Sequence, residues 1–326
     1  MPHPATEVRF WECPPAQLST IVKISHVCRT WRQLSLETGS LWTKIGLYLP
    51  DCAGVIRVGE GLPDVFIARW KRGIEREIEG LQACLERSGS CPLSIAFSSR
   101  EPTAGDLTQF EWLSKLYGEL VDTLLSSSSR WRSIECDITL GIITQPVLQF
   151  LFIARDDLPL LEDVKLSVAF FPGTSDSQEI RNSLRKIRGG NIGLFMAPRI
   201  RSVAVFNYWS PLQGMPVNWA NITHLSFGAY ALEVADIDDT PFPQAPTFFE
   251  ASDALQVLKG CPSLVSCRLC LSSERAWMDP EDTLSQSSVT TLPALTFLHL
   301  QFQVLPPSFA ASLILPSLRE LRLVSS

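Results

Sequence analysis

The chain has 326 residues, of which 45% are hydrophobic and 19% charged, and its net charge is −6. This composition is typical of a folded globular protein and excludes wholesale disorder. The negative charge, without a concentrated run of lysine and arginine, argues against a general nucleic-acid binder, so no nucleic-acid partner is expected. The length is about twice that of a typical domain and predicts a small module followed by a larger or elongated repeat domain.

The compartment is inferred from the N-terminus, the apolar runs and the cysteines. The first residues have neither the basic start nor the apolar run of a signal peptide. The most apolar region, 138–154, is interrupted by polar residues and is too short to span a bilayer, so no membrane partner is expected. Nine scattered cysteines favour reduced, buried thiols over a secreted disulfide framework. We therefore expect an intracellular protein, in the cytoplasm or the nucleus.

The first informative stretch is 24–34, in which apolar residues recur with helical spacing. Ile24, Val27, Cys28, Trp31 and Leu34 follow one face of a helix, while the arginines between them project away from it. Residues 38–40 end this helix, because glycine favours a helix end and serine a helix start. A second helical piece is expected to follow, and its apolar residues are Leu41, Trp42, Ile45 and Leu47.

Two adjacent motifs, 27–32 and 41–45, resemble the C-terminal half of an F-box. The resemblance implies a small all-α module that binds a Skp-type adaptor and, through it, a cullin. Upstream, 14–22 replaces the Leu-Pro pair and the helix rich in Leu and Ile that the family has, so the first half of the motif is degenerate or missing. By resemblance, the core and the adaptor-binding surface comprise Val27, Cys28, Trp31, Leu34, Leu41, Trp42 and Ile45.

The alternative interpretation of these residues is an ordinary helical cap whose tryptophans belong to the core. The joint spacing of Cys-Arg-x-Trp-Arg and Leu-Trp-x-x-Ile favours the F-box interpretation.

The next elements alternate between helix and strand. Glycines and prolines make 51–64 a loop and a candidate boundary. Apolar spacing then predicts a helix over 65–87, a half-buried strand over 93–97 at which the sheet begins, and a second helix over 108–125. The helices should therefore pack on a sheet.

A phrase of the form Pro-x-Leu-x-x-Leu-x-Leu then recurs through the rest of the chain. Its intervals fit a repeat of roughly 20 to 30 residues with insertions, and each copy predicts a turn followed by a short strand. Stacked copies would form a parallel sheet on the concave side of a solenoid, with helices expected at 145–155, 178–188 and 250–259. The seven copies are 129–136, 158–166, 197–205, 219–227, 261–269, 292–300 and 315–323.

This pattern resembles the irregular leucine-rich repeats that follow F-boxes. The expected fold is α/β: a short N-terminal all-α F-box-like module over 1–50, a helical connector with the first strand over 51–128, and an irregular leucine-rich-repeat-like solenoid with a parallel sheet over 129–326. The insertions 236–249 and 272–288 are expected to be loops outside the stack. The alternative is an ordinary α/β domain whose buried strands begin at proline turns.

Motifs that would carry chemistry are scarce. Cys267 and Cys270 form a single CxxC within a predicted strand, where residues three apart face opposite sides, so no metal site is expected. His224 and His299 are predicted to occupy the same position of their copies, on a face of the sheet. The sequence has no nucleophile elbow, no phosphate-binding loop and no dinucleotide fingerprint, so we expect no enzyme and no cofactor.

The functional prediction is the substrate-recognition subunit of an SCF-type (Skp–cullin–F-box) E3 ubiquitin ligase, which binds an unknown protein substrate through its repeats. One alternative is a leucine-rich-repeat scaffold that does not bind the adaptor. The other is an α/β enzyme whose Asp and His residues assemble only in the folded state.

Overall fold

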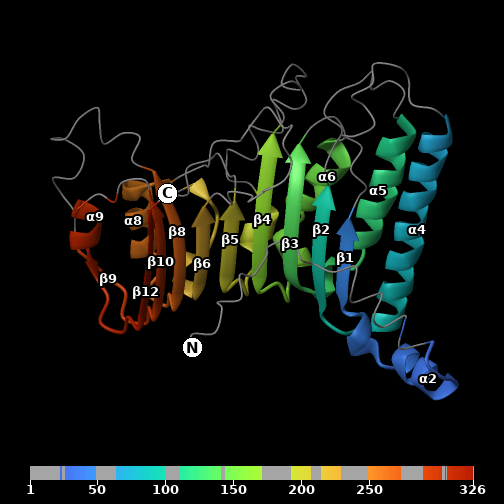
Figure 1. Cartoon of the computed structure of the whole chain (residues 1–326), viewed down its shortest axis with the longest axis horizontal. Coiled ribbons are helices and arrows are strands. Elements are labelled where there is room, and N and C mark those ends of the chain that lie inside the picture. The colour runs from blue at the N-terminus through green and yellow to red at the C-terminus, as the bar shows by residue number, and fades with distance from the viewer. Residues whose placement is uncertain are drawn as a thin grey trace.

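The computed structural model describes residues 23, 26–48, 64–99, 111–140, 144–170, 192–206, 214–228, 249–272, 289–302, 305 and 307–325. Within these ranges a ten-stranded parallel sheet runs the length of the molecule (Figure 1). The predicted α/β class and the predicted parallel sheet are therefore confirmed.

Nine strands lie side by side in chain order, and β7 (Phe249–Glu250) pairs with the end of β8. Two short strands, β9 (Thr290–Thr291) and β11 (Leu313–Ile314), form a separate parallel pair. The nine are β1 (Lys44–Tyr48), β2 (Leu93–Ser99), β3 (Trp131–Leu140), β4 (Asp163–Phe170), β5 (Ser202–Phe206), β6 (His224–Gly228), β8 (Ser266–Ser272), β10 (Phe297–Phe302) and β12 (Glu320–Ser325).

Each of the nine strands places two apolar side chains, two residues apart, on the same face of the sheet. In a strand alternate residues face the same side, so the two positions form two rows across the sheet. The first row is Ile45, Ile95, Ile134, Val164, Val203, Leu225, Cys267, Leu298 and Leu321, and the second is Leu47, Phe97, Cys136, Leu166, Val205, Phe227, Leu269, Leu300 and Leu323. All are buried except those of β12.

The seven phrases found in the sequence are the strands β3, β4, β5, β6, β8, β10 and β12 with the turns before them. The anchor residue three positions before the first row is buried in six phrases and partly buried in the last. Backbone hydrogen bonds join one turn to the next, as from the Arg201 N–H to the Glu162 carbonyl (2.9 Å) and from the Thr223 N–H to the Arg201 carbonyl (2.8 Å). The anchors are Trp131, Leu161, Ile200, Ile222, Leu264, Leu295 and Leu318.

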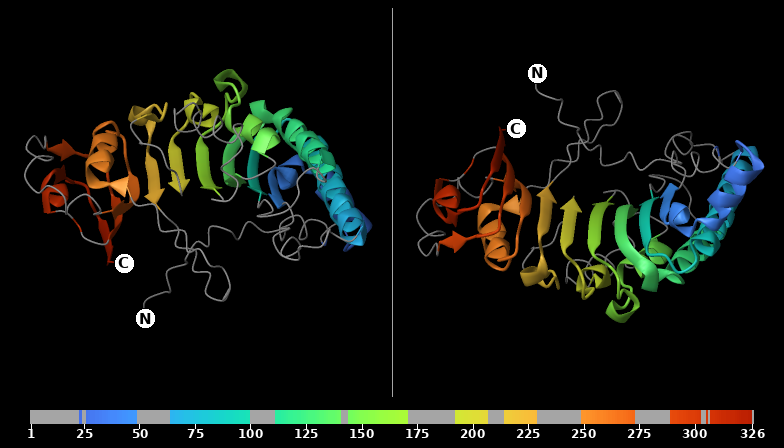
Figure 2. Two further views of the ribbon diagram at one scale, coloured as in Figure 1. Left: turned by 90° about the horizontal axis from the view of Figure 1, so that it is seen from above. Right: turned by 90° about the horizontal axis from the view of Figure 1, so that it is seen from below.

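Helices cover the face of the sheet that carries the two apolar rows (Figure 2). The ring of Phe97 in β2 stacks on Phe150 of α6 (5.5 Å between centroids), and Trp131 packs on the same ring (5.1 Å). The helices are α2 (Arg29–Glu37), α4 (Asp64–Ser88), α5 (Glu111–Leu125), α6 (Thr144–Leu151), α8 (Ala251–Lys259) and α9 (Pro307–Ala311), with the 3-10 turns η1 (Gly39–Trp42), η3 (Ser128–Arg130), η4 (Arg155–Asp157), η6 (Gly193–Met196) and η8 (Trp219–Asn221).

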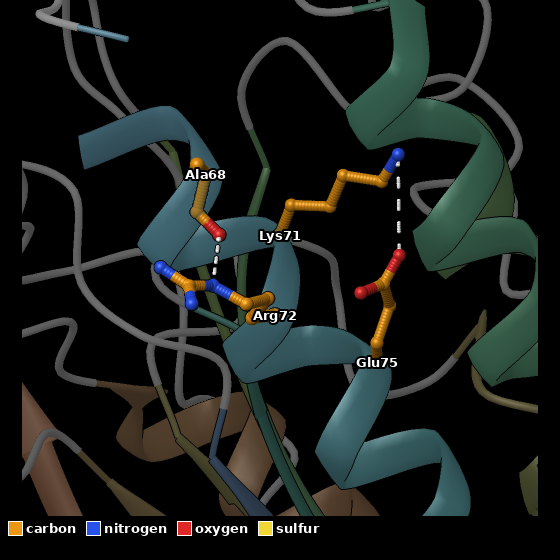
Figure 3. Close-up of polar contacts among 4 residues, drawn as sticks. All are labelled: Ala68, Lys71, Arg72 and Glu75. Atoms are coloured by element: carbon orange, nitrogen blue, oxygen red, sulfur yellow. Dashed lines mark hydrogen bonds and ion pairs between the residues drawn. The ribbon is translucent and has the colours of Figure 1, made fainter. Parts of the chain in front are cut away.

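Helix α4 separates an apolar face from a solvated one. Ile74, Ile78 and Leu81 are buried, as the helical spacing predicts. On the solvated side Lys71 Nζ lies 3.9 Å from Glu75 Oε1, and the Nε–H of Arg72 donates to the Ala68 carbonyl (3.1 Å) (Figure 3). α4 therefore lies on the outside of the molecule, with its charged side facing solvent.

Several expectations need correction. Ile45 and Leu47 lie in β1 and not in a second helical piece, because every other residue of this stretch is buried beside β2. The sheet therefore begins before 93, and the described part of 1–50 is not entirely helical. Helix α6 ends at Leu151, short of the expected 155.

Other expectations fall wholly or mostly outside the described residues. These are the helix over 178–188, most of the insertions 236–249 and 272–288, and the loop over 51–64, whose last residue, Asp64, is described and begins α4. At the end of the first insertion, Phe249 is a buried residue of β7 and not part of a loop. None of the described helices is long and apolar enough to cross a membrane.

Arg130 joins the end of α4 to the start of β2. Its Nε–H and an Nη2–H donate to the Cys91 carbonyl (3.2 and 3.1 Å), and further bonds reach the Leu85 carbonyl and the hydroxyl of Ser88. A cation at a helix C-terminus also interacts favourably with the helix dipole. Arg130 is partly buried, and this burial lowers the pKa of its guanidinium.

Replacing Arg130 should therefore destabilise the fold much more than replacing its neighbour Arg132, which bonds to Glu162 on the exposed surface (2.9 Å). We expect Arg130→Ala to lower the free energy of unfolding by about 2 kcal/mol, since it removes charge-assisted hydrogen bonds. The measurement is urea unfolding followed by circular dichroism, with Arg132→Ala as the matched control. Equal losses for the two variants would contradict this role of Arg130.

Candidate partner-binding surface

Helix α2 is held at both ends by its own backbone. The Cys28 carbonyl, in extended conformation, accepts the N–H of Arg32 (3.0 Å). At the other end the backbone N–H and the hydroxyl of Thr38 both donate to the Leu34 carbonyl (3.0 and 2.7 Å). These are the first and the last i to i−4 bonds of the helix, and the Thr38 hydroxyl adds a second donor to the last of their carbonyls. The chain then passes through η1 into β1.

Trp42 attaches α2 to the body of the protein. Its side chain is 4% exposed, and its indole N–H donates to the Ser35 carbonyl (2.7 Å) in α2. The guanidinium of Arg87, in the last turn of α4, lies 4.5 Å from the centre of the Trp42 ring. Gly39 allows η1 to lie close to the end of α4, since a Cβ on Gly39 would lie 3.1 Å from the Arg87 carbonyl oxygen. One buried tryptophan thus links α2, α4 and the start of β1.

The remaining apolar residues of α2 and its flanks face solvent. Trp31 and Leu34, three residues apart and therefore on the same side of the helix, are 53% and 56% exposed. Val27 before the helix and Leu41 after it are also exposed. We call Val27, Trp31, Leu34 and Leu41 the α2 apolar surface. Figure 1 shows α2 projecting beyond the end of β1, away from the sheet.

The seven residues predicted from the F-box resemblance therefore divide into two groups. Val27, Cys28, Trp31, Leu34 and Leu41 are exposed, whereas Trp42 and Ile45 are buried in the core. The sequence did not distinguish these groups, because all seven have the same apolar character. It also missed Ser35, which is buried and supplies the carbonyl that binds Trp42. A serine between two exposed leucines gives no signal of burial.

The face of the sheet opposite the helices carries mostly polar side chains. In β3 and β4 it presents Glu135 and Lys165, whose charged atoms lie 3.3 Å apart. Farther along, it presents Arg268 in β8, His299 in β10 and Arg322 in β12. A face that carries charged and polar groups suits binding of a polar partner better than it suits packing.

Most of the described cysteines are buried thiols, namely Cys84, Cys136, Cys261, Cys267 and Cys270, whereas Cys91 is partly buried and Cys28 is exposed. Cys267 and Cys270 lie in β8, as predicted, and face opposite sides of the sheet; the thiol of Cys270 contacts Gln301 Oε1 at 3.4 Å. Burial raises the pKa of Cys267, and it raises the pKa of Cys261 to about 12. Protonated thiols are poor nucleophiles and poor metal ligands. Among the described residues there is also no group of three or more His, Cys, Asp or Glu placed to hold a metal ion.

The prediction that His224 and His299 share one position was wrong. His224 aligns with Phe297, and His299 lies two residues farther along its strand, beside Arg268. Leu225 and Leu298 both pair with Cys267. His224 lies one residue before this position and His299 one residue after it, so the two histidines are two residues apart in register. Both nevertheless belong to the polar face.

No protein-family model matches this chain, and a search of curated proteins finds no match to it. The function is therefore inferred from the surfaces that the structure presents.

The division between buried and exposed tryptophans can be tested directly. Trp42→Ala should lower the free energy of unfolding by about 3 kcal/mol, because it creates a cavity and leaves the Ser35 carbonyl without its donor. Trp31→Ala should change it by less than about 1 kcal/mol, since the side chain is largely solvated. Both values come from urea unfolding. A large loss in Trp31→Ala would show that Trp31 belongs to the core and not to a free surface.

Proposed function

We propose that this chain is the substrate-recognition subunit of an SCF-type ubiquitin ligase. In this proposal the α2 apolar surface binds a Skp-type adaptor, which connects the chain to a cullin, and the sheet binds the protein substrate. The observation that carries the proposal is the exposure of Trp31 and Leu34 on a helix that Trp42 fixes firmly to the body. An exposed tryptophan on a rigid support is typical of an interface that is completed by a partner.

The exposed residues are of the right kind to supply affinity. A buried tryptophan is among the commonest binding hot spots and contributes about 2 kcal/mol or more when it enters a pocket. Trp31 and Leu34 provide two neighbouring apolar anchors, and exposed Arg29 and Arg32 accompany them. An apolar centre with polar neighbours is the usual anatomy of a protein interface.

The sheet supports the second half of the proposal, that the chain forms an irregular leucine-rich-repeat-like solenoid. Consecutive phrases give neighbouring strands in constant register, and their turns are joined by a continuous series of backbone bonds. Each unit then buries its apolar pair only against its neighbours. In this interpretation the adaptor-binding module ends at Trp42, where the chain enters the sheet, and the polar face is available to a substrate.

The mechanism would be proximity. The chain itself makes and breaks no bonds; it raises the effective concentration of a bound substrate near the enzyme that transfers ubiquitin. Such a role needs an intracellular location, in the cytoplasm or nucleus, and it needs no cofactor. That the chain is not an enzyme stays a prediction.

A second candidate is a repeat scaffold that binds a partner without an adaptor. The feature that favours it is the segment 14–22, which lacks the Leu-Pro pair and the Leu- and Ile-rich helix found upstream in the family that the motif resembles. The two candidates differ only in whether the α2 apolar surface binds the adaptor.

Isothermal titration of the full chain with a Skp-type adaptor distinguishes them. We expect saturable binding that becomes at least about tenfold weaker in Trp31→Ala and in Leu34→Ala, since each removes an apolar anchor. Met196→Ala is the matched control, because Met196 is a similarly exposed apolar residue in η6. Circular dichroism confirms that each variant is folded.

Absence of binding by the folded wild-type chain would contradict the ligase assignment and leave the scaffold. Equal weakening in Met196→Ala would show that binding does not depend on α2.

A further inference from the structure

Three basic side chains lie in one row across the polar face of the sheet. Arg268 of β8 is paired with His299 of β10, and His299 with Arg322 of β12. Neighbouring strands are about 4.8 Å apart, so the three side chains leave the sheet side by side. We call Arg268, His299 and Arg322 the basic row. Figure 1 shows these three strands at the opposite end of the sheet from α2.

The row faces away from the core. His299 lies between Leu298 and Leu300, which are buried under the helices, so its own side chain is on the other face. Arg268 likewise lies between two buried residues, Cys267 and Leu269, and is exposed. The positive charge is therefore presented on the face that the helices leave uncovered.

The imidazole of His299 has no hydrogen-bond partner among the described residues, although its nitrogens are buried. Both ring nitrogens are out of contact with solvent, and neither makes a hydrogen bond. Leaving a buried polar group unpaired costs free energy that a bound ligand could recover. Burial, with help from Arg268 and Arg322, lowers the pKa of His299. The neutral ring has one N–H to donate and one lone pair to accept.

The two arginines are held differently. The Nε–H of Arg322 donates to Glu320 Oε1 (2.6 Å), and its guanidinium lies 5.5 Å from the centre of the Phe297 ring. These contacts orient the guanidinium of Arg322 through its Nε edge. Its two terminal nitrogens lie on the other edges. Among the described residues no carboxylate forms an ion pair with Arg268. Of the two guanidinium groups only that of Arg322 is paired with a carboxylate, which leaves the described part of the row with excess positive charge.

We propose that the basic row binds an oxyanion, a carboxylate or a phosphoryl group, carried by an acidic segment of a protein partner. The guanidinium groups of Arg268 and Arg322 would hold two edges of the oxyanion. Because the ring nitrogens of His299 are out of contact with solvent, the side chains around the ring would have to move aside for its N–H to complete the hydrogen bonds. Guanidinium groups suit this task because their planar donors match the oxygens of both anions.

Charges elsewhere on the polar face of the sheet would also orient a bound acidic peptide. Around β3 and β4 it carries Glu135, Asp137 and Asp163, with Lys165 paired to Glu135. These carboxylates would repel an acidic segment, whereas the basic row attracts it. An extended peptide crossing the sheet would therefore place its acidic part over β8, β10 and β12.

The inference that the oxyanion belongs to a ligase substrate rests on the proposed function. Oxyanion binding by the basic row does not depend on it. The test uses the full chain and three fluorescein-labelled peptides that are identical except at one central block. The block contains phosphoserine, glutamate or alanine. Fluorescence anisotropy measures binding, and inorganic phosphate serves as an unlabelled competitor.

We expect the phosphoserine peptide, the glutamate peptide or both to bind, and the alanine peptide not to bind. Arg268→Gln and Arg322→Gln should each weaken binding about tenfold, the loss of one charge-assisted contact. Arg199→Gln, which removes an exposed arginine in the turn before β5, should leave it unchanged. The imidazole resonances of His299, followed by NMR, should shift on titration with an acidic peptide that binds. They should not shift on titration with the alanine peptide.

Binding of the phosphoserine peptide alone would identify a phosphoryl ligand, and binding of both would identify a general oxyanion site. Equal weakening by Arg199→Gln would overturn the proposal, because it would indicate unspecific charge attraction. Failure of both acidic peptides to bind the folded chain would overturn it as well. Adaptor binding is measured on the same variants and should not change in Arg268→Gln, so the two proposals can fail independently.

Discussion

The structure depends on one constraint, which is that each strand of the large sheet must bury the same two positions. A strand with only two inward apolar side chains cannot be stable alone, because it buries too little surface. Constant register solves this problem, since the pair on one strand lies beside the pair on the next and under the same layer of helices. The anchor residue three positions earlier then closes the turn, and the backbone of that turn bonds to the turn before it.

This constraint also explains what the sequence could predict. The recurring phrase contains the anchor and both inward residues, so its copies located seven strands and their register, even where Cys267 or Val203 replaces leucine. The first strand escaped prediction because Ile45 and Leu47 were assigned to a helix together with Trp42. Alternation over five residues is too short to outweigh a strong helical motif beside it. The aligned phrases agree with the structural register and place His224 opposite Phe297, so the mistake was to equate the two histidines within that alignment.

The candidate surface could be predicted only in part. Apolar spacing identified the residues of α2, but it could not tell that Trp42 is buried against Arg87 while Trp31 is exposed. That difference arises from the contact of Trp42 in η1 with Arg87 in α4, two elements that are separated by more than twenty residues of chain. The basic row was not predicted, although Arg268, His299 and Arg322 occupy the same position of the last three phrases, because the pattern was read only for its apolar positions.

The two surfaces lie at opposite ends of the sheet, α2 beyond β1 and the basic row across β8, β10 and β12. In the proposed function this separation leaves room for an adaptor at one end and a substrate at the other, and the parallel sheet between them is the rigid spacer. Trp42 and the bonds of Arg130 fix the structure at the α2 end of that sheet.

Hydrogen–deuterium exchange of the full chain, with and without a Skp-type adaptor, tests the central claim most directly, since it locates a contact without altering any residue. The account predicts that the adaptor slows exchange across 26–42 and leaves the strands β8, β10 and β12 unchanged. Unchanged exchange across 26–42, or protection confined to the polar face of the sheet, would contradict it.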